Sequence, residues 1–310
     1  MATFEQYYSM LNSEQKEVVD LLDGPVLVLA GPGTGKTELL SIRAANIIRT
    51  GKAAPENILV LTFTNAAARA MRERLARIIG QKGYDVEVET FHSFANSIVL
   101  ESEEAIDHVK DKVELSDVER VRALRYILDN VKGAAALRPF GSPYIHLSEI
   151  GTRISELKKE GIKPREFKES LKSIKPDGIN LEEKHIARLA ALGEIYERYE
   201  KLKDEDARIV FDARGRIDYD DMILIALETL GREKDLKDRL TRHYRYVMVD
   251  EYQDTNGVQL ELLFSLLDKG KPNLCCVGDD DQSIFRFQGA TLSNFRKLEE
   301  KLPALKKVTL

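Results

Sequence analysis

Two short segments of the sequence carry residue types that handle phosphate chemistry. The first is AGPGTGKT, residues 30–37, in which glycines precede Lys36 and Thr37. The second is VMVDEYQDTN, residues 247–256, where Asp250 and Glu251 follow an apolar run. A third segment, GDDDQSIFRFQGA at residues 278–290, joins carboxylates and a glutamine to two phenylalanines that flank an arginine. Carboxylates suggest a metal or magnesium-bound phosphate, and aromatic rings beside a cation suggest a flat anionic ligand such as a nucleobase.

The first segment has the context that a phosphate-binding loop requires, because it follows the apolar run PVLVLA and precedes a helical pattern. Backbone N–H groups of such a glycine-rich loop turn toward phosphate oxygens, and the helix N-terminus adds a positive dipole. Lys36 would reach the β- and γ-phosphates, and the Thr37 hydroxyl would ligate Mg²⁺. The alternative is a glycine-rich turn with a chance lysine. The predicted nucleotide-binding residues are Ala30, Gly31, Pro32, Gly33, Thr34, Gly35, Lys36, Thr37 and Glu38. A strict pattern has glycine at position 30, but ordinary backbone angles suffice at the end of a strand.

The acidic pair of the second segment stands at the end of an apolar strand. Asp250 would hold Mg²⁺ through its water shell, and Glu251 would polarise the attacking water as general base. An acidic pair in this place often only caps the next helix. Together with the loop at 30–37, however, it indicates a site for nucleoside triphosphate hydrolysis.

Strand and helix patterns alternate in the first third of the chain. Apolar runs at 25–30, 57–64 and 86–91 predict strands, and a helix is expected from Lys36 to about Thr50. Asn65 is expected to cap a helix whose core face is formed by Ala67, Met71, Leu75 and Ile78. Helical patterns then prevail from residue 97 to 214, and strand patterns return at 244–250 and 273–278. We therefore expect an α/β fold, a parallel sheet flanked by helices, interrupted by a mainly α-helical insertion.

Composition excludes several classes of protein. The 310 residues are 43% hydrophobic and 32% charged, with a formal net charge of −5, which argues against coating nucleic acid through bulk charge. No apolar run is long enough to cross a bilayer, and the first residues do not resemble a signal peptide. The adjacent Cys275 and Cys276 would point to opposite faces of a strand, so they predict reduced core residues and a cytoplasmic protein.

Five segments occur in the order found in one family of motor proteins. They are AGPGTGKT, LTFTNAAARAMRERL, TFHSF, DEYQDTN and GDDDQSIFRFQGA. Together they resemble the N-terminal half of the UvrD/Rep/PcrA type of superfamily 1 DNA helicase. LNSEQKEVV (11–19), ISELKKEGIKPREF (154–167) and RIDYDDMI (216–223) also resemble that family. The resemblance implies a RecA-like motor core at 1–96 and 215–310, a helical 1B insertion at 97–214, and a second motor domain that this chain lacks.

The resemblance also implies roles for individual residues. Gln15 would contact the adenine, and Gln282 would sense the γ-phosphate as a further catalytic residue. Phe285 and Phe287 would stack on bases of a single DNA strand, although core packing is the plain alternative for phenylalanines. Contacts to the same strand are implied for Phe63, Thr64, Asn65, Thr90 and His92. The last four residues are threonines, an asparagine and a histidine, and such side chains are also common as local caps.

The predicted function is that of an ATP-dependent helicase that uses ATP and Mg²⁺ to move 3′ to 5′ along single-stranded DNA and unwind duplexes. Its partners would be single strands, single–double strand junctions and repair or replication proteins, without a membrane. The 310 residues alone are expected to turn over ATP weakly or not at all. Open alternatives are the motor of a nuclease complex, an RNA translocase, or a nucleotide-binding module without turnover. Residues 158–175 hold seven Lys or Arg against three Glu, which could grip duplex phosphates or form a solvated helix face.

Overall fold

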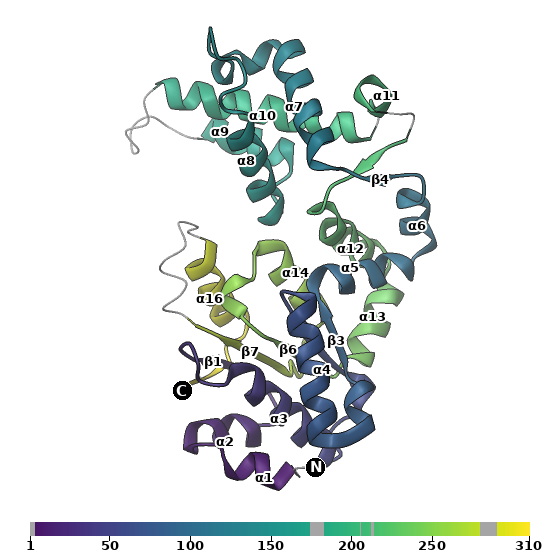
Figure 1. The fold of residues 1–310 in the computed structure, drawn as a ribbon, viewed down its shortest axis with the longest axis vertical. Coiled ribbons are helices and arrows are strands. Elements are labelled where there is room, and N and C mark those ends of the chain that lie inside the picture. Colours follow the sequence, from purple (N-terminus) through teal and green to yellow (C-terminus); the bar gives the residue numbers. More distant parts are fainter. Residues whose placement is uncertain (1–3, 174–182, 205, 212–213, 280–289) are drawn as a thin grey trace. The chain divides into compact units, whose positions relative to one another are not determined.

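The structure of the chain is a computed structural model, and it describes residues 4–173, 183–204, 206–211, 214–279 and 290–310. It forms two compact units (Figure 1). The sheet unit comprises Met1–Glu101 and Ala226–Leu310, and the helical unit comprises Ser102–Ile225. Each unit is described below by itself.

The sheet unit is built on one six-stranded sheet with the order β3-β2-β6-β7-β1-β8. Every neighbouring pair in it is parallel. The strands are β1 (Val26–Leu29), β2 (Ile58–Thr62), β3 (Glu87–Thr90), β6 (Tyr246–Val249), β7 (Leu274–Gly278) and β8 (Lys306–Thr309). The predicted α/β class, a parallel sheet flanked by helices, is confirmed.

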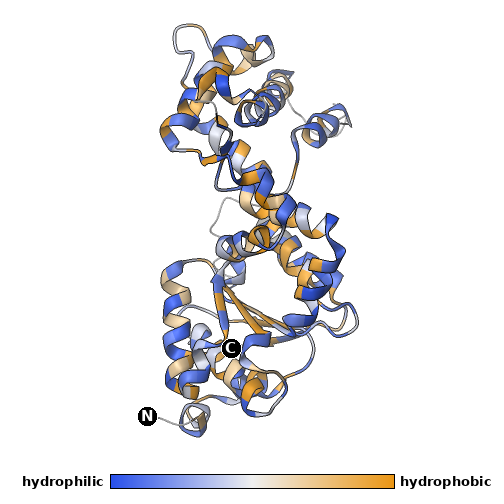
Figure 2. Cartoon of the chain, turned by 90° about the vertical axis from the view of Figure 1, so that its right-hand side faces the viewer, coloured by the Kyte–Doolittle hydropathy of each residue, from blue (hydrophilic) through white to orange (hydrophobic). Residues whose placement is uncertain are grey.

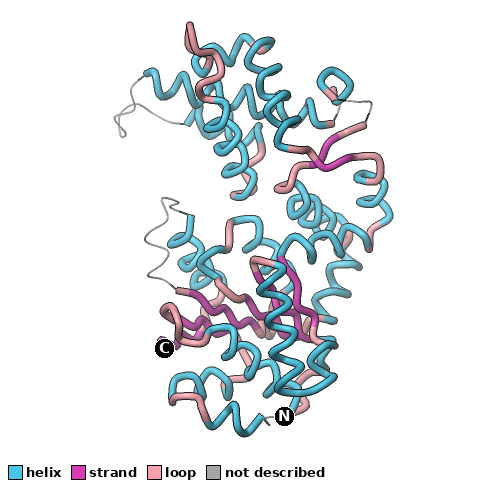
Figure 3. Tube along the Cα trace, in the orientation of Figure 1, coloured by secondary structure: helices cyan, strands magenta, loops and turns pink. Residues whose placement is uncertain are grey.

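Both faces of this sheet are apolar because helices cover both of them. Ile58 and Val60 pack into the core shared with α3 and α4, whereas Leu59 and Leu61 alternate to the other face and are equally buried. The strands stand out as apolar ribbons in Figure 2 and lie between helical layers in Figure 3. The helices are α1 (Phe4–Ser9), α2 (Ser13–Asp20), α3 (Lys36–Arg49), α4 (Asn65–Ile79), α5 (Phe91–Leu100), α13 (Lys234–His243), α14 (Gly257–Leu266) and α16 (Ala290–Lys301).

The start of α4 differs from the expectation. Thr64 is its N-cap, since the Thr64 side chain accepts a hydrogen bond from the backbone N–H of Ala67, and Asn65 is already the first helical residue. The buried face is therefore shifted by one residue at its beginning, with Ala68 rather than Ala67 in the core. The predictions of Asn65 as the cap and of Ala67 on the core face were wrong, because the shorter hydroxyl side chain one residue earlier satisfies the free N–H.

The helical unit has its own apolar core, formed mainly by α7, α8 and α10. It also contains a two-stranded parallel sheet, β4 (Val113–Glu114) with β5 (Arg216–Ile217), which the helical patterns did not predict. Its helices are α6 (Glu103–Val109), α7 (Asp117–Asn130), α8 (Leu147–Lys159), α9 (Pro164–Ser173), α10 (Glu183–Lys203) and α11 (Ala207–Val210). The helix α12 (Asp221–Arg232) begins in this unit and continues into the sheet unit.

Cys275 and Cys276 lie on β7 and are buried free thiols. Burial raises the pKa of both thiols, so they behave as small core residues, as expected. Among the described residues, no helix has both the length and the apolar character needed to cross a membrane.

Candidate nucleotide-binding site

The loop between β1 and α3 has the backbone geometry of a phosphate cradle. Gly33 and Gly35 adopt φ angles of +78° and +79°, a region that side chains with a Cβ rarely enter. Ala30 needs no such freedom, because it continues the strand and its N–H donates to the carbonyl of Gly278 at 2.9 Å. Gly35 is the residue before α3, so the first N–H groups of that helix have no acceptor within the helix and point toward the loop.

Two side-chain contacts join this loop to the acidic pair after β6. The Thr37 hydroxyl donates to Asp250 Oδ2 at 2.9 Å. Lys36 Nζ lies 3.1 Å from Glu251 Oε2, and the lysine is buried, with a relative exposure of 8%. In the sheet order β6 and β1 flank β7, so the fold brings together residues more than 200 positions apart at one edge of the sheet.

The Asp250 carboxylate is buried, and burial raises its pKa, with the neighbouring Glu251 adding to the effect and the Thr37 hydroxyl opposing it. A buried carboxylate whose ionised form is disfavoured gains most from a cation. The Thr37 hydroxyl and the Asp250 carboxylate are the hard oxygen donors that Mg²⁺ prefers. These two side chains therefore fit a magnesium site at the mouth of the loop.

Gln15, the predicted adenine contact, also links the start of α2 to the loop between β1 and α3. Its Nε2 donates to the carbonyl of Thr34 at 3.0 Å, while its Oε1 accepts the N–H of Asn12 in a capping box at the start of α2. One amide thus fixes the N-terminal helix and braces the phosphate loop. Glu38 lies in the first turn of α3, where a carboxylate stabilises the positive helix end.

The residues expected to meet a nucleic-acid strand lie at the carboxyl ends of β2 and β3. Thr64 and Thr90 are both N-caps, Thr90 accepting from the N–H of Ser93 at 3.1 Å. Phe63 is partly exposed and contacts the buried Phe91 edge to face, with ring centroids 6.0 Å apart. Asn65 is exposed and His92 is half-buried. Local capping accounts for both threonines, and a DNA contact by any of these residues stays a prediction.

The predicted γ-phosphate sensor Gln282 and the predicted stacking residues Phe285 and Phe287 lie outside the described residues. The segment that carries them begins directly after β7, at Asp279, which is buried. Asp279 therefore follows a strand that lies between β1 and β6, the strands that precede Lys36 and Asp250.

Comparison with known proteins assigns the chain to a family. The family model described as "UvrD/REP helicase N-terminal domain" matches residues 11–303. The chain belongs to the UvrD/REP helicase N-terminal domain family. It is 33% identical over 300 residues to the ATP-dependent DNA helicase PcrA of Bacillus subtilis, which covers 96% of this chain and 36% of that protein. It is also 33% identical over 297 residues to DNA helicase II of Rickettsia typhi, with 96% and 41% of the two chains covered. The chain thus spans about two-fifths of the length of these relatives.

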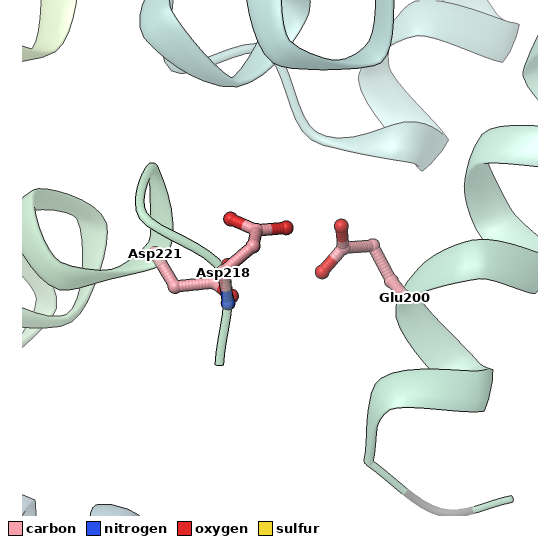
Figure 4. A group of neighbouring side chains, drawn as sticks. All are labelled: Glu200, Asp218 and Asp221. Atoms are coloured by element: carbon pink, nitrogen blue, oxygen red, sulfur yellow. The ribbon is translucent and has the colours of Figure 1, made fainter. Parts of the chain in front are cut away.

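The helical unit of this UvrD/REP domain holds a second cluster of charges. Three carboxylates, from Glu200, Asp218 and Asp221, lie within 4.8 Å of one another (Figure 4). The ammonium groups of Lys158 and Lys203 lie among these carboxylates, each within 3.5 Å of all three. The five groups form what we call the buried charge cluster, in which lysines supply the positive charge that the carboxylates require.

The cluster connects segments that are distant in the sequence. Lys158 is on α8, Glu200 and Lys203 are on α10, and Asp218 and Asp221 lie at the start of α12. Burial raises the pKa of Glu200, whereas the two lysines outweigh burial at Asp218 and hold its pKa below the usual range. The cluster was not predicted from the sequence. The one signal for it is that Lys158 lies on the same face of α8 as the buried residues Leu147, Ile150 and Ile154.

The cluster also changes the interpretation of the basic stretch at 158–175. Lys158 has 1% exposure of its side chain and cannot contact a ligand on the surface. Lys168 pairs with Glu194 and Glu197 of α10, and Arg165 pairs with Glu169. Part of the apparent positive charge is therefore neutralised within the UvrD/REP domain itself, which favours the solvated-face alternative for these residues.

Proposed function

We propose that this chain is the ATP-binding part of a DNA helicase that couples ATP hydrolysis to movement along single-stranded DNA and to duplex unwinding. The supporting observation is that Lys36 contacts Glu251 at 3.1 Å and Thr37 contacts Asp250 at 2.9 Å, although the two pairs follow β1 and β6, strands that are not neighbours in the sheet. The names of the relatives, ATP-dependent DNA helicase PcrA and DNA helicase II, support ATP as the nucleotide and DNA as the track.

In this proposal, each residue of the site has one role. Lys36 binds the β- and γ-phosphates, and the N–H groups of the loop hold the phosphate oxygens. Thr37 and Asp250 hold Mg²⁺, which supplies charge neutralisation for the phosphates when it is bound. Glu251 orients the attacking water and accepts its proton. Gln15 contacts the adenine, and Gln282 would report the γ-phosphate.

The contact between Lys36 and Glu251 suggests how the general base is held inactive until a nucleotide is bound. The ammonium group now neutralises the general base. A triphosphate carries more negative charge than one carboxylate, so it draws Lys36 toward the phosphates and leaves Glu251 available to water.

Apart from residues 97–101 and 215–225, the sheet unit corresponds in this proposal to the motor core (residues 1–96 and 215–310), and the helical unit to the insertion domain (97–214). Single-stranded DNA would cross the carboxyl ends of β2 and β3, where Phe63, Thr64, Asn65, Thr90 and His92 are found. Stacking by Phe285 and Phe287, the 3′-to-5′ direction and a cytoplasmic location are kept as predictions from the sequence.

The test is the ATPase activity of the whole protein that contains this chain, measured with oligo(dT), with oligo(rU) and without nucleic acid. We expect stimulation by oligo(dT), and loss of turnover in Glu251→Gln with ATP binding retained. Equal stimulation by RNA would favour an RNA translocase. Wild-type protein without any ATP turnover would reject the enzymatic proposal.

A further inference from the structure

Gln253 bridges the general base to the strand between the two halves of the site. It lies in the short 3₁₀ turn Tyr252–Asp254 after β6 and is 94% buried, with a relative exposure of 6%. Its Nε2 donates to Glu251 Oε2 at 2.7 Å, and its Oε1 accepts the backbone N–H of Asp279 at 2.9 Å. The orientation of the amide follows from its partners, since a carboxylate can only accept and a backbone N–H can only donate.

The amide packs closely against the end of β7. A Cβ at Gly278 would lie 2.9 Å from Gln253 Oε1 and 3.1 Å from Gln253 N, so the absence of a side chain at Gly278 permits this close approach. The turn itself is anchored on its other side, where the Tyr252 hydroxyl donates to the carbonyl of Asn294 at 3.0 Å. Gln253 is therefore held between two fixed backbone segments.

Glu251, in contrast, is placed by an unusual backbone and few contacts. Its φ of 52° is the only positive value found for a non-glycine residue among those the structure describes. Its side chain is 40% exposed, so burial alone does not orient it. Lys36 and Gln253 both contact Oε2, so neither of these two contacts engages Oε1.

We propose that Gln253 is a positioning residue for hydrolysis, which keeps the Glu251 carboxylate oriented once Lys36 has turned to the phosphates. This inference rests on the proposed function, because it assumes that Glu251 is the general base. Gln253 also ties the position of that carboxylate to the carboxyl end of β7, at Gly278 and Asp279. A shift of this strand end would then be transmitted to the general base through a single amide.

Gln253→Glu is the most direct test, because it keeps the size and the acceptor toward Asp279 but replaces the donor with a charge that repels Glu251. We expect the kcat of ATP hydrolysis in the whole protein to fall about 10- to 100-fold, the value of one hydrogen bond to a charged group. The KM and the Kd for MgATP should change by less than about twofold, since Lys36, Thr37 and Asp250 are untouched.

Gln259→Glu is the matched control. Gln259 is a buried glutamine of the same segment, and its side chain accepts the N–H of Asn256 in the capping box of α14 without touching Glu251. Glutamate serves equally well at that position of a capping box, so turnover should stay unchanged. Gly278→Ala offers a second perturbation, because the new methyl group would press on the Gln253 amide and should also lower kcat.

The outcomes separate this inference from the proposed function. If Glu251→Gln is inactive and Gln253→Glu hydrolyses ATP like the wild type, the positioning role is wrong while the function stands. The role is also wrong if Gln253→Glu loses MgATP affinity or thermal stability in proportion to its activity, because the effect is then structural. In single-turnover measurements of the residual hydrolysis by Glu251→Gln, adding Gln253→Glu should lower the rate by less than about twofold, since both changes act on one step.

Discussion

Lys158→Met should destabilise the helical unit more than any surface change to the same helix. Lys158 Nζ lies 2.6 Å from Asp218 Oδ1, 2.5 Å from Asp221 Oδ1 and 3.5 Å from Glu200 Oε1. Methionine has a similar length and packs well in a core, so the change removes the charge with little loss of volume. What remains is the single ammonium of Lys203 facing all three carboxylates.

The magnitude follows from the burial of the partners. Removing one member of a buried ion pair costs about 3–5 kcal/mol, because the opposite charge is left uncompensated. Glu200 has a pKa already raised by burial, so it can take up a proton and relieve part of the repulsion. We therefore expect a loss near the lower limit, about 3 kcal/mol in the free energy of unfolding at neutral pH.

The loss should depend on pH in a defined direction. The lysines hold the pKa of Asp218 below its unfolded value, so Asp218 adds stability that is present above the unfolded pKa of about 4 and is lost at lower pH. Without Lys158 this pKa rises, and the stabilisation disappears at a higher pH than in the wild type. Both proteins then lack it in strong acid, so the difference between them is largest at neutral pH and shrinks below about pH 4.

Urea unfolding followed by circular dichroism measures the free energy, and hydrogen exchange of α8 and α10 against α3 assigns the loss to the helical unit. Lys159→Met is the matched control, since Lys159 is the next residue of α8 and is exposed. It should change the stability by less than about 0.5 kcal/mol. The double variant Lys158→Met/Asp218→Asn should recover part of the loss. Equal stability of the two single variants would refute the role of the cluster.

Three further changes test the nucleotide-binding site and the strand ends. Lys36→Ala should weaken MgATP binding roughly 10- to 100-fold, measured by equilibrium titration, because one charged hydrogen-bond donor to phosphate is lost. Asp250→Asn should raise the melting temperature in the absence of nucleotide, since a buried carboxylate whose pKa is raised is replaced by a neutral group, and should abolish the dependence of ATP binding on Mg²⁺. Thr90→Ala should cost about 1 kcal/mol of stability through loss of the cap, and Thr90→Ser should cost much less, as thermal unfolding would show. If both Thr90 variants bind DNA with the affinity of the wild type, Thr90 acts as a cap and does not contact DNA.

Much of the sheet unit could be predicted because its strands are apolar on both faces. The runs at 57–64 and 244–250 contain β2 and β6, whose residues are all buried. The loop at 30–37 was recognisable for a local reason, since strand, glycines and helix follow one another directly. Ends of elements were less accurate, as at Thr64, because a cap depends on one hydrogen bond rather than on a pattern.

The contacts that the sequence could not predict are those fixed by tertiary structure. Lys158 and Asp218 are 60 residues apart and meet only when α8 packs beside the start of α12. Gln253 reads as one more polar residue after a strand until the parallel order β6-β7-β1 brings Asp279 within reach of its amide. The β4–β5 pair has two residues in each strand, too few for any periodicity.

In the proposed function, the position of β7 lets a single strand end serve both the nucleotide and the DNA. The loop with Lys36 follows β1 and Asp250 follows β6, the strands on either side of β7, so the carboxyl end of β7 lies between this loop and the acidic pair. Gln253 contacts that end directly, and the segment predicted to stack on DNA begins one residue later. If this prediction holds, a displacement of DNA along the segment would reach Glu251, the proposed general base, by a short route through the backbone of Asp279 and the Gln253 amide. The same route would let nucleotide binding change the affinity for DNA, because the coupling of two binding sites is reciprocal.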